Sequence, residues 1–390
     1  MARKNGPRKN QDWGTVLRRK IAGGISMNAK RLFIAATRQN DGKTMTSLGL
    51  YNAFQKRFKS ITYMKPVGQQ FLMVNGEKID KDAVLFGKVY GIQDSLAKMS
   101  PIAVPKGFTE DYIDHPHPRD IHDKILQHFN ALAKGKDFVL IEGTGHAGVG
   151  SVFDASNADV AKLLATKVVL VSLGGIGRCI DEILLNKACF DLMGVEIAGV
   201  IINKVIPDKY DKTVAYLEKG LAYKGIRFLG AIPYVNMLSS PLMRQLQEGL
   251  GADILSGEDQ LDNRVGKVLI GAMDSTDALD YFEKDTVLVV PGNREAIIMT
   301  ALFGNLLKKK VDFNISGIVF TGGIGPDDKI FQLIKHTKIP MLLVPDDSYS
   351  VATRINSMLV KLRAEETEKI AKIQYLVEKH VDVDEICRVM

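Results

Sequence analysis

Continuous apolar runs that alternate with amphipathic stretches are the feature that most constrains this fold. Six such runs occur in the first 240 residues, and helical periodicity separates most of them. Strands that are apolar throughout are typical of a parallel sheet covered by helices on both faces. In such sheets, ligands bind beyond the carboxyl ends of the strands. The six runs span residues 31–36, 60–67, 137–143, 167–173, 197–203 and 226–233.

The same pattern starts again after residue 245, in a second and smaller set of runs. A polar, glycine-rich stretch at 247–266 reads as a linker, and from about Ser350 the chain is helical and charged. The later apolar runs lie at 267–273, 285–292, 315–323 and 339–345. We therefore predict an α/β chain in four parts. They are a basic arm at 1–30, a first α/β domain at 31–245, a smaller α/β domain at 246–360 and a C-terminal helical segment at 361–390.

The composition is that of an ordinary globular protein, with 46% hydrophobic and 25% charged residues. No long run of uncharged apolar residues occurs, which argues against a membrane span. The three cysteines, Cys179, Cys189 and Cys387, have neither metal-site nor disulfide spacing. This pattern favours a reducing compartment, so we predict a cytoplasmic protein.

The net charge of +7 is concentrated at the N-terminus. Residues 1–31 hold nine Lys or Arg and one acid, Asp12, whereas the rest of the chain has a net charge of −1. The segment has no apolar core and is therefore not a secretory signal. A basic arm that touches nucleic acid or acidic lipid is one interpretation. We favour a solvated terminus, because chain ends are usually loose, and expect no nucleic-acid partner.

A phosphate-binding loop is predicted between the first apolar run and the helix after it. The segment "IAATRQNDGKTMTSLGL" (34–50) contains Gly42, Lys43 and Thr44, the end of the motif G-x-x-x-x-G-K-[ST]. Backbone N–H groups of the loop and of the helix N-terminus would surround an anion. Lys43 would reach the terminal phosphates, and the Thr44 hydroxyl would bind magnesium. Thr37 replaces the first glycine, so a working variant and a chance tripeptide both stay open.

Polar residues at the ends of two later runs add to this site. Glu142 lies where a carboxylate can hold magnesium directly or through water, although an acid there can also cap the next helix. Asn203 has a side-chain amide, which can read an adenine edge. Guanine-specific proteins use N-K-x-D at this place, and Ile206 stands where the Asp would be. The pattern therefore favours ATP over GTP.

The segments "TRQNDGKT", "YMKPVGQ", "LIEGTG", "IINKV" and "LGAIP" together resemble dethiobiotin synthetase over roughly residues 31–240. Loops of that family have Thr in place of the first glycine, so the departure at Thr37 is the family's own pattern. The resemblance implies a P-loop NTPase-type parallel sheet with helices on both faces. It also implies that Lys65, from the Lys-Pro pair, faces the acceptor and neutralises a carbamate. A charged residue that merely leaves a strand is the alternative.

The resemblance further implies roles within the loop and around a magnesium ion. Thr44, Glu142 and an acid of "DKDAVLF" would bind Mg2+; Asp82 is the best match for that acid, and Asp80 competes. Arg38 lies where related MinD-type ATPases place a signature lysine, so it is either a finger to the phosphates or a solvent-facing residue. We expect three catalytic residues, Lys43, Lys65 and Arg38. The expected cofactor-binding residues are Thr37, Asp41, Gly42, Lys43, Thr44, Met45 and Asn203.

The second domain resembles the DRTGG domain over roughly residues 250–360. Arg294, Thr321, Gly322 and Gly323 carry the name-giving pattern. A small-molecule site, tight turns and a subunit contact are all compatible with them. The pairing of domains is similar to the N-terminal half of long bacterial phosphate acetyltransferases. The chain stops before the acyltransferase domain of those enzymes, so we expect no acetyl-transfer activity.

Two other features have ordinary structural explanations. Four of the seven histidines lie in 115–128, where a metal site is conceivable. A proline-broken loop that enters a helix is the interpretation we favour. The glycine-rich turn at 172–183 would either line the nucleotide cleft, with Arg178 or Asp181 entering it, or simply place Asp181 in the first turn of a helix.

Two functions remain open from the sequence. In one, the chain is a nucleotide-dependent regulatory or switch protein, and its DRTGG domain senses a ligand or pairs subunits. In the other, it is an ATP-dependent ligase that activates a carboxylate or carbamate. Dethiobiotin formation itself is not expected, because "GQQFLMVNGEKIDKDAV" departs from that family after Lys65. We favour the switch because the sequence indicates no pocket for an acceptor molecule. We expect ATP and Mg2+ as cofactors, and we expect a homodimer.

Overall fold

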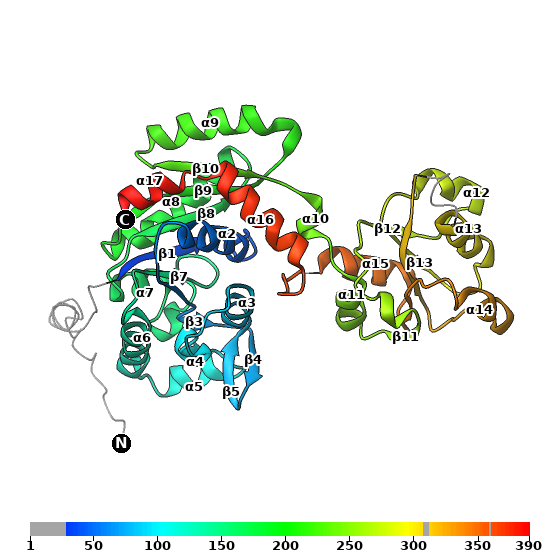
Figure 1. Cartoon of the computed structure of the whole chain (residues 1–390), viewed down its shortest axis with the longest axis horizontal. Helices are drawn as coiled ribbons and strands as arrows, with labels where there is room; N and C mark the ends of the chain where they lie inside the picture. Colours follow the sequence, from blue (N-terminus) through cyan, green and yellow to red (C-terminus); the bar gives the residue numbers. More distant parts are fainter. Residues whose placement is uncertain (1–28, 307–311, 359) are drawn as a thin grey trace, which may run out of the picture. The chain divides into compact units, whose positions relative to one another are not determined.

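The computed structural model describes residues 29–306, 312–358 and 360–390, and its chain divides into two compact units (Figure 1). The first unit comprises Met1–Tyr234 together with Leu362–Met390, and the second comprises Val235–Lys361. Nearly all of the basic arm predicted at 1–30 lies outside the described residues. The C-terminal helices, which the sequence set apart as a segment of their own, belong to the first unit.

The first unit is built on a six-stranded sheet in which every neighbouring pair of strands is parallel. The strand order is β10-β9-β8-β1-β7-β2, so the loop-bearing strand β1 lies between β7 and β8. This confirms the parallel sheet that the continuous apolar runs predict. The strands are β1 (Lys30–Ala36), β2 (Ile61–Met64), β7 (Phe138–Glu142), β8 (Val168–Leu173), β9 (Ile197–Val205) and β10 (Phe228–Pro233).

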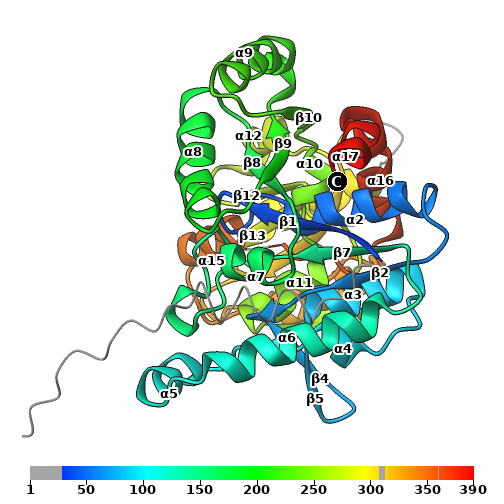
Figure 2. The same ribbon diagram turned by 90° about the vertical axis from the view of Figure 1, so that its left-hand side faces the viewer.

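Helices cover both faces of this sheet (Figure 2). On one face lie α2 (Lys43–Gln55), α16 (Thr367–His380) and α17 (Val383–Val389), and on the other lie α7 (Asn157–Leu163) and α8 (Gly177–Leu192). Burial from both sides explains why β7 consists only of buried residues. The remaining helices are α3 (Lys81–Tyr90), α4 (Leu96–Met99), α5 (Phe108–Asp114), α6 (Pro118–Ala133) and α9 (Tyr210–Tyr223).

The run predicted at 60–67 is two strands, because Lys65 and Pro66 separate β2 from the short β3 (Val67–Gly68). Strand β3 pairs with β6 (Ile102–Ala103). After β3 comes a hairpin that the helical and apolar patterns do not predict, formed by β4 (Phe71–Val74) and β5 (Glu77–Asp80). Its turn is Asn-Gly at 75–76, with positive φ at both residues, which is the strongest short-range hairpin signal in a sequence.

The C-terminal helix α16 packs directly on α2, the helix that follows the phosphate loop. Val377 of α16 is buried against Gly49 of α2, where an added Cβ would lie 2.3 Å from Val377 Cγ2. The side chains of Asn52, on α2, and Lys56, its C-cap residue, both donate to Glu378. Glycine at position 49 therefore allows a close approach of two helices that are more than 300 residues apart in the sequence.

The second unit holds a five-stranded sheet in the order β11-β15-β14-β13-β12. Strands β12 to β15 are parallel, and β11 is antiparallel to β15. The strands are β11 (Asp253–Ser256), β12 (Lys267–Ile270), β13 (Thr286–Val290), β14 (Ile315–Phe320) and β15 (Met341–Leu343). Its helices are α10 (Asn236–Ser239), α11 (Met243–Leu250), α12 (Ser275–Ala278), α13 (Glu295–Leu306), α14 (Asp328–Ile334) and α15 (Ser348–Ser357).

The linker predicted at 247–266 is wrong. This stretch forms the end of α11 and the strand β11, and Leu250, Ala252, Leu261 and Val265 are part of a buried core. Its scattered apolar residues follow no simple period, yet they join one core with Val289, Val319 and Leu342 of the sheet. The glycines that suggest a linker instead form turns, and Gly251 and Gly257 have positive φ.

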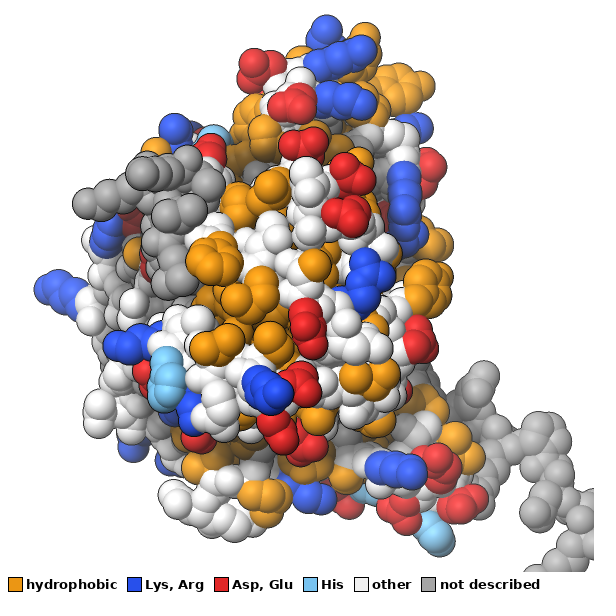
Figure 3. Space-filling view, turned by 90° about the vertical axis from the view of Figure 1, so that its right-hand side faces the viewer, with side chains coloured by type: hydrophobic (Ala, Val, Ile, Leu, Met, Phe, Trp, Pro, Cys, Tyr) orange, Lys and Arg blue, Asp and Glu red, His pale blue; other side chains and the backbone are white. Residues whose placement is uncertain are grey.

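Exposed side chains of the second unit include several large apolar residues. Hydrophobic side chains gather on the face drawn in Figure 3. The apolar residues of this unit that are at least 40% exposed are Leu279, Tyr281, Phe303, Ile324, Leu333 and Tyr349. Scattered apolar residues are normal on a protein surface, whereas a contiguous patch of them marks a binding surface.

No helix among residues 29–306, 312–358 and 360–390 is both long and apolar enough to cross a bilayer. Cys179, Cys189 and Cys387 are free thiols, in agreement with their spacing.

Candidate functional site

The loop between β1 and α2 presents an uncapped helix N-terminus. Gly42 is the N-cap residue with φ 92°, no side chain caps the helix, and its first turn holds no acid. The first N–H groups of an α-helix have no partner within the helix. Those at Lys43, Thr44 and Met45 are therefore oriented to receive an anion, and the helix dipole favours negative charge there.

Thr37, which replaces the first glycine of the motif, is part of the loop's internal bracing. Its hydroxyl donates to Asp41 Oδ2 at 2.7 Å and lies 3.0 Å from Ser172 Oγ on β8. The Arg38 N–H donates to the same Asp41 oxygen at 2.8 Å. The positive φ angles of the loop fall at Asn40 and Gly42. Since the backbone at Thr37 lies outside the left-handed region, no glycine is needed there.

Asp41 is a buried carboxylate within the loop, with a side chain 1% exposed. Burial raises the pKa of Asp41 to about 6, although its hydrogen bond from Thr37 acts in the opposite direction. Its Oδ1 has no hydrogen-bond partner among the described residues. The loop thus contains an acid whose charged form is disfavoured by burial.

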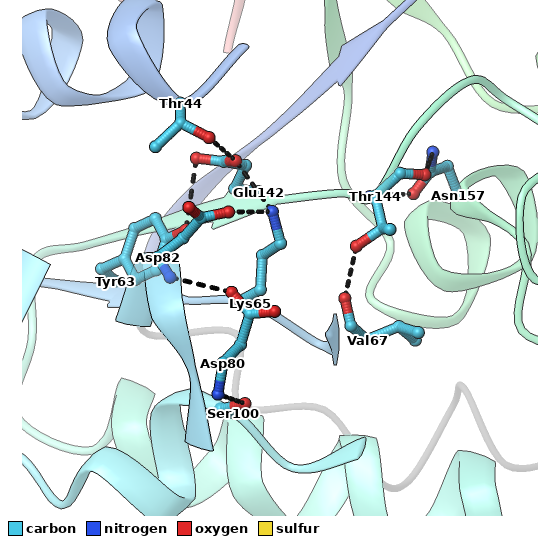
Figure 4. Close-up of polar contacts among 10 residues, drawn as sticks. All are labelled: Thr44, Tyr63, Lys65, Val67, Asp80, Asp82, Ser100, Glu142, Thr144 and Asn157. Carbon is cyan, nitrogen blue, oxygen red and sulfur yellow. Dashed lines mark hydrogen bonds and ion pairs between the residues drawn. The ribbon is translucent and has the colours of Figure 1, made fainter. Parts of the chain in front are cut away.

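A compact charged cluster lies beside the loop (Figure 4). Lys65 Nζ donates to Asp82 Oδ2 at 2.7 Å and to Glu142 Oε1 at 2.9 Å. The Thr44 hydroxyl donates to the same Glu142 oxygen at 2.8 Å, and Tyr63 Oη donates to Glu142 Oε2 at 3.2 Å. Glu142 is fully buried and Lys65 is 4% exposed. One ammonium group therefore lies between two carboxylates beside the hydroxyl of the phosphate loop.

The two lysines of the site differ in the balance of forces on their charge. Burial, followed by repulsion from Lys65, lowers the pKa of Lys43 to about 8. Burial also acts to lower the pKa of Lys65, but the carboxylates of Asp82 and Glu142 outweigh it and raise that pKa. The charge of Lys65 is thus balanced by two neighbouring carboxylates, whereas the surroundings of Lys43 disfavour its charged form.

Strand register explains how these residues meet. Glu142 pairs with Ile34 of β1, and Met64 of β2 pairs with Ile141, so Lys65 emerges level with Glu142. Of the two acids that compete on sequence, Asp82 contacts the cluster. Asp80 caps α3 by accepting from the Asp82 N–H at 2.9 Å, and its negative charge also acts on Lys65.

Asn203 lies near the end of β9, and its side chain is hydrogen-bonded to the loop. Its Nδ2 donates to the Asp41 carbonyl at 2.8 Å, and its Oδ1 accepts from the Lys204 N–H at 2.9 Å. A Cβ at Gly42 would lie 1.9 Å from Asn203 Nδ2. Gly42 is therefore required for this close approach as well as for its positive φ.

Arg38 points to α8 in this structure. Its Nη2 lies 2.5 Å from Glu182 Oε1, which also accepts from Arg178 Nε at 2.7 Å. Asn186, one turn further along α8, donates to the Thr37 carbonyl at 3.1 Å. Sequence reasoning missed Glu182 and Asn186, because neither belongs to a motif.

The histidine-rich stretch at 115–128 behaves as a loop that enters a helix, and Pro118 is the first residue of α6. No group of three or more His, Cys, Asp or Glu suited to a metal occurs in the part of the chain that the structure describes.

The residues singled out in the second unit lie at the carboxyl ends of its strands. Arg294 follows β13 and donates from Nη2 to the Met273 carbonyl at 3.0 Å. Thr321 follows β14, and its hydroxyl lies 2.7 Å from Ser348 Oγ. Gly322 and Gly323 both have positive φ. Strands β13 and β14 are neighbours in the sheet. Arg294 and the Thr-Gly-Gly turn therefore follow adjacent strands at the same edge of the sheet.

A parallel sheet whose central strand leads through a Gly-Lys-Thr loop into a helix defines a P-loop protein. Comparison with protein families agrees with this class. The chain belongs to the AAA domain family, whose profile matches residues 30–242, and a DRTGG domain profile matches residues 245–358.

Curated relatives with this pair of domains are phosphate acetyltransferases. The protein from Nitratidesulfovibrio vulgaris is 26% identical over 367 residues, which cover 92% of this chain and 51% of the relative. The protein from Synechocystis is 29% identical over 367 residues, which cover 91% of this chain and 51% of the relative. The chain thus spans about half the length of the curated relatives it matches and resembles their N-terminal half.

Similar solved structures cover part of this chain. A ParA family ATPase from Chlorobium tepidum is 18% identical, with a TM-score of 0.35, over 54% of this chain and 86% of that one. The CBS and DRTGG regulatory region of a Clostridium perfringens pyrophosphatase, in complex with its activator diadenosine tetraphosphate, is also 18% identical. Its TM-score is 0.25, over 34% of this chain and 48% of that one.

Proposed function

We propose that this chain binds Mg-ATP at the loop between β1 and α2 and works as a nucleotide-dependent switch. One observation carries the proposal: Lys43 and Thr44 begin an uncapped helix and lie beside the buried carboxylate of Glu142. An anion site, a cation for terminal phosphates and an acid for a metal are thereby brought together.

The donor set fits a magnesium ion. Mg2+ prefers oxygen ligands, and the Thr44 hydroxyl and the carboxylates of Asp82 and Glu142 supply them. The ammonium of Lys65 already lies within hydrogen-bond distance of both carboxylates, which supports a cation position there. In this proposal Lys43 binds the terminal phosphates, and a bound magnesium would neutralise charge on those phosphates.

Loop residues have supporting roles in the same proposal. Thr37 and Asp41 hold the loop in shape, while Gly42 and the N–H groups of Lys43 to Met45 surround the phosphates. Asn203 lies at the loop, so reading an adenine would require it to exchange its bond to the Asp41 carbonyl for one to the base.

The way the chain continues from the second unit into α16, which packs on α2, supports the switch. The chain leaves the second unit at Lys361 and soon enters α16, which packs on α2 through Val377 and Glu378. Because α2 begins with Lys43, a displacement of α16 would reach the first residues that contact phosphate. We propose that ligand binding or subunit pairing in the second unit acts through this contact.

The ligand of the second unit is proposed to be an anion held at the carboxyl ends of β13 and β14. Arg294 would supply the charge, and Thr321, Gly322 and Gly323 would supply backbone and hydroxyl donors. Leu333 of α14, which is apolar and 67% exposed, is proposed to lie in a homodimer contact. Size-exclusion chromatography with light scattering tests this, since Leu333→Asp should then yield a monomer.

An ATP-dependent ligase is the second candidate. The buried ammonium of Lys65 beside the phosphate loop favours it, because such a lysine can neutralise a carbamate or an acyl phosphate. Arg38 would then leave Glu182 to reach the terminal phosphate. ATP turnover separates the two functions: rates below about one per minute with every small acid tried exclude the ligase, since typical enzymes turn over about 10 times per second.

Calorimetric titration with a non-hydrolysable ATP analogue and Mg2+ tests nucleotide binding. We expect Lys43→Ala to abolish binding with the fold retained, because it removes the cation of the phosphate loop. Lys59→Ala is the matched control, since this exposed lysine lies beyond the far end of α2 and its loss should leave affinity unchanged. Equal affinity in wild type and Lys43→Ala would refute the placement of the site.

A further inference from the structure

We propose that the Lys65 ammonium is a built-in cation that occupies the metal position of the nucleotide-free chain and is displaced when a divalent metal enters. This inference rests on the proposed Mg-nucleotide site. It assigns Lys65 a role in controlling when that site accepts a metal.

The geometry around Lys65 is that of a cation held by metal ligands. Its Nζ contacts Asp82 Oδ2 at 2.7 Å and Glu142 Oε1 at 2.9 Å, while Thr44 Oγ1 lies 2.8 Å from that same Glu142 oxygen. Thr44 lies in the first turn of α2, and the carboxylates of Asp82 and Glu142 lie beside it (Figure 4). Lys65 is thus bonded to both acids of the proposed metal set, and Thr44 completes the set.

A metal and the ammonium compete for the same oxygens. A magnesium ion binds carboxylate oxygen at about 2.0–2.1 Å, so an ion on Glu142 Oε1 would lie within about 5 Å of Nζ in its present position. Three positive charges would then face the carboxylates of Glu142 and Asp82, which are 0% and 13% exposed. Lys43 adds a fourth positive charge nearby, and Asp80 adds a further negative one. Repulsion at this distance inside a protein is strong. Metal entry therefore requires Lys65 to move.

Burial decides where the displaced ammonium goes. Lys65 is 4% exposed, so it has no ready access to bulk water, and an unpaired buried ammonium is costly. Terminal phosphates of a bound nucleotide are the new anions that arrive beside it. Lys65 would thus be delivered to the phosphates only when metal and nucleotide are both present. A metal alone should bind poorly, because nothing would then neutralise the released lysine.

The contrasting possibility is that the cluster is a permanent structural ion pair. Both possibilities predict that removal of Lys65 harms stability, since it leaves two acids close together. They differ in metal binding without nucleotide. If Lys65 occupies the metal position, its removal opens that position, whereas a structural ion pair has no metal affinity to reveal.

Binding of Mn2+ to the nucleotide-free protein, followed by the paramagnetic resonance signal of free Mn2+, tests the proposal. We expect Lys65→Met and Lys65→Gln to bind Mn2+ at least about tenfold more tightly than wild type, within the usual range of coupling between sites. Lys65→Arg keeps the charge and should stay weak. Lys43→Met is the matched control, since it removes one nearby charge without vacating the metal position, and its gain should be clearly smaller.

Thermal melting covers the case in which the neutral variants are unstable. Mn2+ should then raise the melting temperature of Lys65→Met and Lys65→Gln and leave wild type unchanged. Mn2+ affinity and melting that are the same in wild type and in both neutral variants would overturn the proposal. Analogue binding by wild type but not by Lys43→Ala would still support the proposed function in that case. Failure of wild type to bind the analogue refutes the proposed function instead.

Discussion

Restoring the missing glycine of the phosphate loop should lower the free energy of unfolding of this protein. In Thr37→Gly the loop would match the standard motif, yet the Thr37 hydroxyl bonds Asp41 at 2.7 Å and lies 3.0 Å from Ser172. The side chain is 2% exposed, so water cannot replace these contacts without entering the core. Three variants separate the contributions: Thr37→Ser keeps the hydroxyl, Thr37→Val keeps the shape, and Thr37→Gly keeps neither.

The magnitudes follow from what each variant removes. Thr37→Ser loses one buried methyl group, worth about 1 kcal/mol of unfolding free energy. Thr37→Val loses a hydrogen bond to a carboxylate, worth about 1.5–3 kcal/mol above the pKa of Asp41. Thr37→Gly loses both and adds freedom to the unfolded chain, for a total of about 3–5 kcal/mol.

Urea unfolding read by hydrogen exchange of peptides from β1 and α2 measures this series. Peptide resolution is needed because the two units can unfold separately, so a whole-chain signal would not be two-state. The expected order of stability is wild type, Ser, Val, then Gly. Equal stability of the Ser and Val variants, or a gain in Thr37→Gly, would refute the idea that Asp41 and Ser172 replace the role of the glycine.

Two further predictions concern Asp41 and Gly49. Burial raises the pKa of Asp41 from 3.8 to about 6, so the folded state holds a proton that the unfolded state has lost, and stability falls as pH rises between these values. Thr37 and Arg38 can still donate to Asn in Asp41→Asn, which should therefore gain about 3 kcal/mol relative to wild type between pH 4 and pH 7 in urea unfolding; parallel pH profiles would contradict this. For Gly49→Ala, the added Cβ would lie 2.3 Å from Val377 Cγ2, and we expect faster hydrogen exchange in α16 and a loss of about 1–3 kcal/mol from overpacking. Alanine's better helix propensity alone would instead give a gain of about 1 kcal/mol, which is the contrary outcome.

Local pattern was enough to predict the parallel sheet and the phosphate loop. The stretches 138–141 and 168–171 are apolar at every position, and only strands buried on both faces require that. Gly42, Lys43 and Thr44 are adjacent in sequence, so their spacing alone indicates the loop. The missed hairpin of β4 and β5 was also legible, from Asn-Gly at 75–76.

The contacts within the site could not be predicted in this way, because they join residues that are far apart in the chain. Thr44 and Glu142 are 98 positions apart, and Asn203 and Asp41 are 162 apart. The sequence indicated that these residues end strands or begin a helix. It contained no signal that Lys65 would bond both Asp82 and Glu142, or that Arg38 would pair with Glu182.

What the sequence by itself determined is therefore the set of elements and the chemistry available at their ends. Only the tertiary structure decided which strand ends lie side by side. The strand order β8-β1-β7-β2 sets the neighbours of the loop, and the strand register sets how far along the sheet each side chain lies. The packing of α16 on α2 belongs to the same category. A 14-residue helix near the C-terminus shows an apolar face in the sequence, but its partner exists only once the sheet has brought α2 to that surface.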